Sequence, residues 1–227
     1  MAQVEPGFLE HRLTEISDLV RHGLRDALLA LETGDAAVAQ RVIDADDEVD
    51  RRCLALDRDA EILLVGQVVP GRDIALVLAS TRIARNLERM ADQCVTIAKL
   101  VQAGGNDEPG SAAVRQSLEE MGRRGERMLE AATDALSRRD AARAQQLDEL
   151  DNLVDELNRT VVEQVLEIGG DHARRAWGLR MVLCARALER IADNAVDIAE
   201  QASYVVTGEL REFSDASHPD ENTGEAA

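Results

Sequence analysis

The sequence predicts an all-α protein made of two tandem, pseudo-symmetric three-helix bundles. No segment alternates between apolar and polar residues as a strand would, whereas apolar residues recur at the three- and four-residue spacing of amphipathic helices. The chain also repeats itself, because RNLERMADQCVTIAK at 85–99 matches RALERIADNAVDIAE at 186–200. Further upstream, the segment 27–50 aligns with the segment 132–155. Two blocks that recur in the same order indicate an internal duplication.

The first copy is expected to contain three long helices. Apolar residues from Leu13 to Leu31 mark one face of the first helix, and Thr33-Gly34 interrupts it. Asp35 can then cap the second helix, which ends near Gly66, and the third helix runs from about Asp73 to Val101. Long helices joined by such short turns must run antiparallel.

The second copy follows the same plan, with breaks near 138–140 and 169–170. A Gly-rich stretch, AGGNDEPGS, separates the copies. After the second copy the chain becomes polar and acidic, and we expect its last dozen residues to be disordered. The predicted division is a first repeat at 1–103, a linker at 104–111, a second repeat at 112–208 and an acidic, disordered tail at 209–227.

Composition narrows the class of protein. The 227 residues carry a formal net charge of −18. Nucleic acid is therefore not an expected partner, because binding it requires clustered Lys and Arg. Cations and basic protein surfaces are the expected partners. We find no apolar run of about 20 residues and no signal-peptide pattern, so we expect a cytoplasmic protein without membrane insertion. The cysteines show no C-x-x-C pattern and are expected to be reduced and buried; they are Cys53, Cys94 and Cys184.

Carboxylates recur at four-residue spacing in both copies, which places them above one another on one helix face. On the third helix of each copy they are expected to face outward, and on the second helix they flank the apolar stripe. If these helices are neighbours, the acids meet across an outer groove, where a hard cation would bind their oxygens and remove the like-charge repulsion. The candidate metal ligands are Asp46, Asp50, Glu88 and Asp92 in the first copy and Asp151, Asp155, Glu189, Asp193 and Asp197 in the second.

Other interpretations of these acids stay open. Arg186 and Arg190 precede Glu189 and Asp193 by three residues, so the column can also be an ordinary solvated face with surface ion pairs. A di-iron carboxylate enzyme is disfavoured, because such sites need Glu-x-x-His motifs that face the bundle interior. The sequence has no phosphate-binding Gly-rich loop and no G-x-S-x-G motif, so we expect no catalytic centre and no enzyme activity.

The duplicated LERMADQCVTIAK and LERIADNAVDIAE, each preceded by an Asp-x-x-x-Asp pair, resemble the signature of the PhoU family. Members of this family are phosphate-uptake regulators built from two three-helix bundles. The resemblance covers roughly residues 8–210 and includes the closing QASYVVTGE. It implies that the nine candidate acids bind metal ions, iron or zinc above all, with magnesium and manganese as alternatives. Thr96 stands where the second copy has Asp197, so the first cluster is expected to hold fewer ions.

The resemblance also implies a function. Family members damp the phosphate-starvation response by linking a phosphate ABC transporter, through its ATPase subunit, to a sensor histidine kinase. Two alternatives stay open, namely an accessory protein of another phosphate or ion transporter and a metal-binding helical protein without kinase coupling. The segment Asp73-Ile74-Ala75 departs from the family's usual Asp-Leu-Arg. Long alanine-rich helices with few aromatic residues further suggest a homodimer, as in many relatives.

Overall fold

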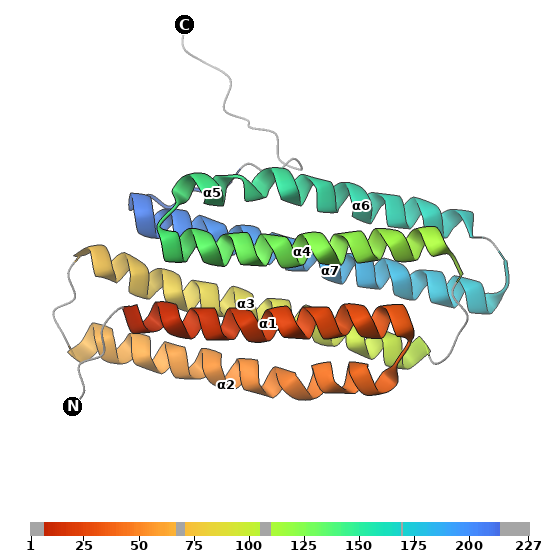
Figure 1. The fold of residues 1–227 in the computed structure, drawn as a ribbon, viewed down its shortest axis with the longest axis horizontal. Helices are drawn as coiled ribbons and strands as arrows, with labels where there is room; N and C mark the ends of the chain where they lie inside the picture. Colours follow the sequence, from red (N-terminus) through yellow and green to blue (C-terminus); the bar gives the residue numbers. More distant parts are fainter. Residues whose placement is uncertain (1–6, 67–70, 105–109, 169, 214–227) are drawn as a thin grey trace, which may run out of the picture.

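A computed structural model describes residues 7–66, 71–104, 110–168 and 170–213, and this part of the chain contains helices and no strand (Figure 1). The predicted fold of two three-helix bundles is confirmed. The first copy consists of α1 (Gly7–Thr33), α2 (Ala36–Gly66) and α3 (Gly71–Gly104). The second consists of α4 (Ala112–Arg138), α5 (Ala141–Gln145), α6 (Leu147–Glu167) and α7 (His172–Thr207). Within the described residues, no helix is both long and apolar enough to cross a membrane.

Short polar side chains and left-handed residues set the helix boundaries. Asp35 caps α2 as predicted, because its Oδ1 accepts the backbone N–H of Ala37 at 2.8 Å. Asp171 caps α7 in the same way by accepting the N–H of Arg174 at 3.0 Å. Gly34 and Gly208, which follow α1 and α7, have positive φ angles of 70° and 75°. Glycine adopts this conformation without steric cost, so each helix ends there.

The second helix is the element in which the two copies differ most. In the first copy α2 is continuous over 31 residues. In the second copy the chain turns at Gln146, between α5 and α6, and Gln146 N–H bonds to the carbonyl of Arg143 at 3.3 Å. The helix periodicity of the sequence gave no sign of this interruption, because α5 and α6 keep the same apolar face toward α4 and α7.

The third helices form the centre of the molecule. α3 packs against α7 and α1 against α4, whereas α2 and α6 contact only helices of their own copy within the described residues. Figure 1 shows the consequence, with α2 at one edge of the molecule and α5 and α6 at the other. Buried aliphatic side chains from all six long helices join in one core. Burial of this apolar surface is the main force that holds the two copies together.

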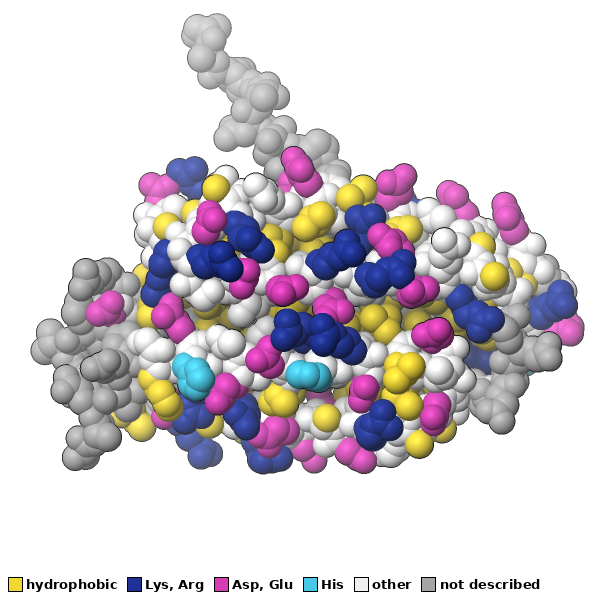
Figure 2. Space-filling view, viewed as in Figure 1, with side chains coloured by type: hydrophobic (Ala, Val, Ile, Leu, Met, Phe, Trp, Pro, Cys, Tyr) yellow, Lys and Arg dark blue, Asp and Glu magenta, His cyan; other side chains and the backbone are white. Residues whose placement is uncertain are grey.

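Polar contacts line the α1–α4 seam on the face that Figure 2 shows, where basic and acidic side chains are interspersed. Arg139 pairs with Glu10 at 2.7 Å, and Arg25 Nε donates to Glu126 at 2.6 Å. Exposed pairs of this kind contribute only about 0–1 kcal/mol each, so they fix the register of the helices more than they stabilise the seam.

The ends of the predicted domains lie partly outside the described residues. Most of the linker falls there, and so does the tail from residue 214 onward, including the dozen residues expected to be disordered. The described part of the tail packs on the bundle, because the N–H of Phe213 donates to Glu200 Oε1 at 2.7 Å and its ring contacts the core. All three cysteines are free and buried, as predicted.

Candidate metal-binding clusters

The first acidic cluster, formed by Asp46, Asp50, Glu88 and Asp92, lies where α2 contacts α3. Partial burial and the charges of Asp50 and Asp92 raise the pKa of Asp46 to about 6. The Oδ1 atom of Asp46 is buried and has no hydrogen-bond partner among the described residues. Glu88 and Asp50 both lie near Cys53 of α2. Their negative charges add to the effect of burial, which raises the pKa of Cys53 to about 12.

The second acidic cluster consists of Asp151 and Asp155 on α6 and Glu189, Asp193 and Asp197 on α7, which contacts α6; Asp197 also lines a cavity between α7 and α3. Partial loss of water, together with the charges of Glu189 and Asp155, raises the pKa of Asp193 to about 6. Burial also raises the pKa of Glu189. The positive charge of Arg186 opposes this rise, and the negative charge of Asp155 adds to it. The structure therefore brings α6 and α7 carboxylates close enough to repel one another, as the sequence predicted.

Glu189 does not face outward as expected. Its exposed fraction is 8%, whereas Asp193 and Asp197 are exposed. Arg186 Nη1 pairs with Glu189 Oε1, and Asn158 Nδ2 donates to the same oxygen at 3.4 Å. The other oxygen, Oε2, is buried with no hydrogen-bond partner among the described residues. A helical wheel misplaces this residue because α6 covers a flank of α7 that the wheel leaves open.

Position 197 and its counterpart in the first copy have different surroundings. Burial raises the pKa of Asp197, and the charge it feels most strongly is that of Arg89 on α3, in the other copy. The corresponding residue, Thr96, donates its hydroxyl to the carbonyl of Asp92 at 2.9 Å. That hydroxyl is thus used within its own helix, so the first cluster has four carboxylates against five in the second.

These clusters have the chemistry of a cation site but not a closed coordination shell. No group of three or more His, Cys, Asp and Glu side chains stands close enough to hold a metal ion in the residues that the structure describes. Asp46 and Glu189 nevertheless each have a buried carboxylate oxygen without a hydrogen bond among the described residues. Leaving such an oxygen unpaired is costly, and a cation would satisfy it and offset the repulsion around it. The free oxygens of Asp46 and Glu189 are therefore of the kind that a hard cation binds, with Arg186 as a competing partner for Glu189.

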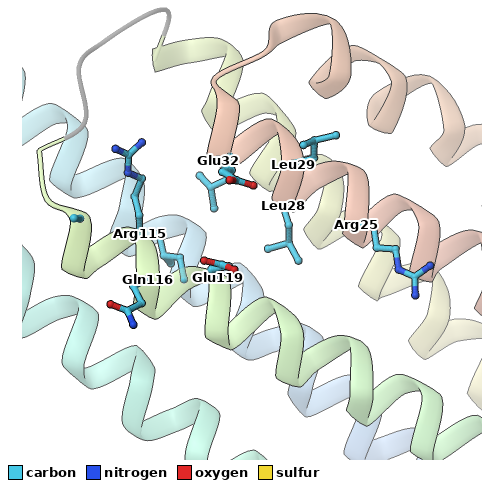
Figure 3. A pocket seen from close by; sticks show the side chains of 10 residues that line it. Arg25, Leu28, Leu29, Glu32, Arg115, Gln116 and Glu119 are labelled. Carbon is cyan, nitrogen blue, oxygen red and sulfur yellow. The ribbon is translucent and has the colours of Figure 1, made fainter.

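Another cavity lies elsewhere. It has a volume of about 590 Å³ and opens between the end of α1 and the start of α4. Figure 3 shows Leu28 of α1 pointing toward α4 and Glu119 of α4 pointing toward α1, and Arg115 and Gln116 of α4 also line the cavity. None of the nine candidate ligands lines this cavity, so it is not part of the predicted metal sites.

Helix packing also makes several residues unusual that the sequence pattern does not single out. Glu200 is partly buried, and burial and the charges of Asp197 and Glu212 raise its pKa to about 7, although the Phe213 N–H opposes the rise. Arg82, Arg85 and Arg89 follow one another at three- and four-residue spacing on α3 and line a cavity together. That spacing was a signal in the sequence, but its meaning depends on α7, which closes the cavity.

The fold and the acidic residues define the class of this protein. It is a duplicated three-helix bundle with acidic clusters on the second and third helix of each copy. The family model described as the PhoU domain matches residues 13–101 and 118–202, one match in each copy. The chain therefore belongs to the PhoU family.

Named relatives are similar over most of their length. A phosphate-specific transport system accessory protein PhoU homolog from a Burkholderia species is 29% identical over 204 residues, which cover 87% of this chain and 85% of the relative. The Escherichia coli accessory protein PhoU is 28% identical over 192 residues, with 84% and 79% covered. The crystal structure of the phosphate transport system regulatory protein PhoU from Streptococcus pneumoniae has a TM-score of 0.83 and 25% identity, with 92% and 98% covered. PhoU from Pseudomonas aeruginosa has a TM-score of 0.80 and 26% identity.

Proposed function

We propose that this protein regulates phosphate uptake and negatively controls the phosphate-starvation response. The observation that carries the proposal is the match of both copies to proteins named as accessory or regulatory components of phosphate transport. The same similarity supports an association with a phosphate transporter. The family resemblance of the sequence implies that the partners are the ATPase subunit of the transporter and a sensor histidine kinase. Because those partners act at the inner side of the membrane, we place this protein in the cytoplasm.

The proposed role is that of an adaptor and needs no chemistry of its own. A net charge of −18 favours approach to basic surfaces on the partners and makes the association rate fall as salt rises. Acids on α2 and α6, which lie at the two edges of the bundle, are available to a partner without separation of the copies.

We further propose that the two acidic clusters bind metal ions. Asp46, Asp50, Glu88 and Asp92 would hold ions on the first copy, and Asp151, Asp155, Glu189, Asp193 and Asp197 on the second. The unpaired oxygens of Asp46 and Glu189 and the raised pKa values around them support this. Iron or zinc is the expected metal by family resemblance, and a bound ion would supply positive charge that changes the surface presented to a partner. Ion binding to this surface is thus a route by which metal and partner binding are coupled.

A strain that carries altered second-cluster residues tests this function. The four changes are Asp151→Asn, Asp155→Asn, Glu189→Gln and Asp193→Asn, with circular dichroism to show that the protein is folded. A matched control carries Glu32→Gln and Glu119→Gln, which remove exposed acids outside the clusters. In ample phosphate we expect the starvation genes to become constitutively active in the cluster strain and to stay silent in the control.

A deletion strain separates the two parts of the proposal. If deletion activates the genes and the cluster variant does not, the regulatory function stands and the metal clusters have no part in it. If deletion itself leaves the genes silent in ample phosphate, the kinase coupling is wrong, and the protein serves another transporter.

A further inference from the structure

A second cavity lies between the two copies, at the contact of α3 with α7. Its volume is about 480 Å³, within the range of small-molecule sites. α3 contributes Arg82, Arg85, Asn86 and Arg89, and α7 contributes Gln201. Because both copies build its walls, the cavity exists only in the assembled two-copy fold.

The arginines of this cavity have hydrogen-bond donors to spare. Arg82 Nη1 donates to Gln201 Oε1 at 3.2 Å. The nearest carboxylate oxygen to Arg85 is Glu88 Oε2 at 3.9 Å, which is beyond hydrogen-bond distance. Arg89 makes no hydrogen bond or close ion pair with any described residue, although it feels the charge of Asp197. Each guanidinium offers five N–H donors in a planar fork that suits oxyanions.

A buried amide points to a ligand more specifically. Asn86 has an exposed fraction of 7%, lines the cavity and makes no hydrogen bond with the described residues. The second copy has Ala187 at the corresponding position, so the bundle itself does not need an amide there. Asn86 therefore offers a side-chain amide, unused within the bundle, to a molecule that enters the cavity.

Carboxylates on the same walls restrict what that ligand can be. Asp57, Glu88 and Asp197 line the cavity and equal the arginines in number. An oxyanion with no proton would be repelled by these acids. Inorganic phosphate retains at least one P–OH at neutral pH, so it can accept from guanidinium and amide groups while donating to a carboxylate. Sulfate has no such donor, and unpaired acceptors facing one another would exclude it.

We propose that this inter-copy cavity binds inorganic phosphate, with Arg85, Arg89 and Asn86 donating to its oxygens and Asp57, the wall carboxylate outside the acidic clusters, accepting a hydrogen bond from its P–OH. Arg82 and Gln201 close the α7 side through their hydrogen bond. A ligand here would touch α3 and α7 together, so its occupancy would act on the contact that joins the copies. The proposal rests on the cavity alone and goes beyond the regulatory function proposed above.

Phosphate binding to the purified full-length chain, stripped of metal with a chelator, tests the proposal. Equilibrium dialysis with labelled inorganic phosphate measures Kd, and unlabelled sulfate and AMP are the competitors. We expect Arg85→Gln with Arg89→Gln to raise Kd by at least about tenfold, because two charge-assisted hydrogen-bond donors are lost. Asn86→Ala, which copies the residue of the second repeat, is expected to raise Kd by a smaller factor. Circular dichroism confirms that each variant is helical.

The cavity between α1 and α4 provides the matched control. Arg25→Gln with Arg115→Gln removes two arginines from the α1–α4 cavity and should leave Kd unchanged. Loss of binding in this control with retention in the α3 variants would overturn the proposal. So would the absence of phosphate binding, equal competition by sulfate or AMP, or binding that appears only with added metal and survives loss of Arg85 and Arg89.

Discussion

At the scale of single residues, the acidic side chains of this protein differ in which of their carboxylate oxygens have a partner. Glu189 shares one oxygen between Arg186 and Asn158 and leaves the other buried and unpaired. Asp46 has a buried, unpaired oxygen as well, among carboxylates and without a described ion pair. An ion pair with arginine and a site for a cation are therefore compatible on one helix face. At Glu189 the ion pair uses one carboxylate oxygen, and the other oxygen stays available to a cation.

Glu200 gives a prediction for pH dependence. Its pKa in the folded protein is about 7, above the value of about 4.3 expected in the unfolded chain. The folded state therefore holds more protons than the unfolded state between these values, and stability falls as pH rises through that window. Glu200→Gln keeps an oxygen for the Phe213 N–H and removes the charge. In metal-free protein it should raise the melting temperature at pH 8 by roughly 2–4 °C and flatten its decline from pH 5 to pH 8.

The control for this pH prediction is Glu32→Gln, which removes one exposed carboxylate from the end of α1. Its melting temperature should follow that of the wild type at every pH. A Glu200→Gln protein that melts lower than wild type at pH 8 would show that the ionised carboxylate stabilises the tail contact.

At the scale of helices, the sequence predicted most of what the structure contains. Hydrophobic periodicity, the Asp35 cap and the glycines after α1 and α7 act within a few residues, so local pattern is enough to find them. Burial of Glu189 and the cavity around Asn86 depend on which neighbouring helix covers which flank. Such packing joins residues more than 30 positions apart, as Asn158 and Glu189 show, and helical spacing does not encode it.

The α1–α4 seam gives a prediction at this scale. A Cβ added at Gly122 on α4 would overlap the methyl groups of Leu28 on α1, so glycine leaves room for that side chain. Gly122→Val should lower the free energy of unfolding by about 1–3 kcal/mol through overpacking. Gly23 on α1 has no atom within 4 Å of an added Cβ. Gly23→Val is therefore the control, and helix propensity should make it neutral or stabilising by a few tenths of a kcal/mol.

Urea denaturation of the two valine variants measures the difference. Equal midpoints would mean that Leu28 swings into the adjoining cavity at no cost and that the seam does not depend on a glycine.

At the scale of the whole molecule, association is the first property to test. Several large apolar side chains are exposed at the outer helices, including Leu54 and Ile62 on α2 and Leu153 and Leu166 on α6. Burial of such surface between two molecules of this protein would drive dimerisation. We expect sedimentation at micromolar concentration to show a species of about twice the 24.8 kDa chain mass. A single species at the chain mass would reject the homodimer.

The claim that the acidic clusters are cation sites is tested most directly by elemental analysis of protein purified without chelator. Wild type should retain metal, Glu189→Gln with Asp193→Asn should lose the larger share, and Glu88→Gln with Asp92→Asn the smaller, because Thr96 gives the first cluster one carboxylate fewer. Glu32→Gln with Glu119→Gln should match the wild type. Equal metal content in all four proteins would contradict the assignment and leave the carboxylates as a solvated surface of the bundle.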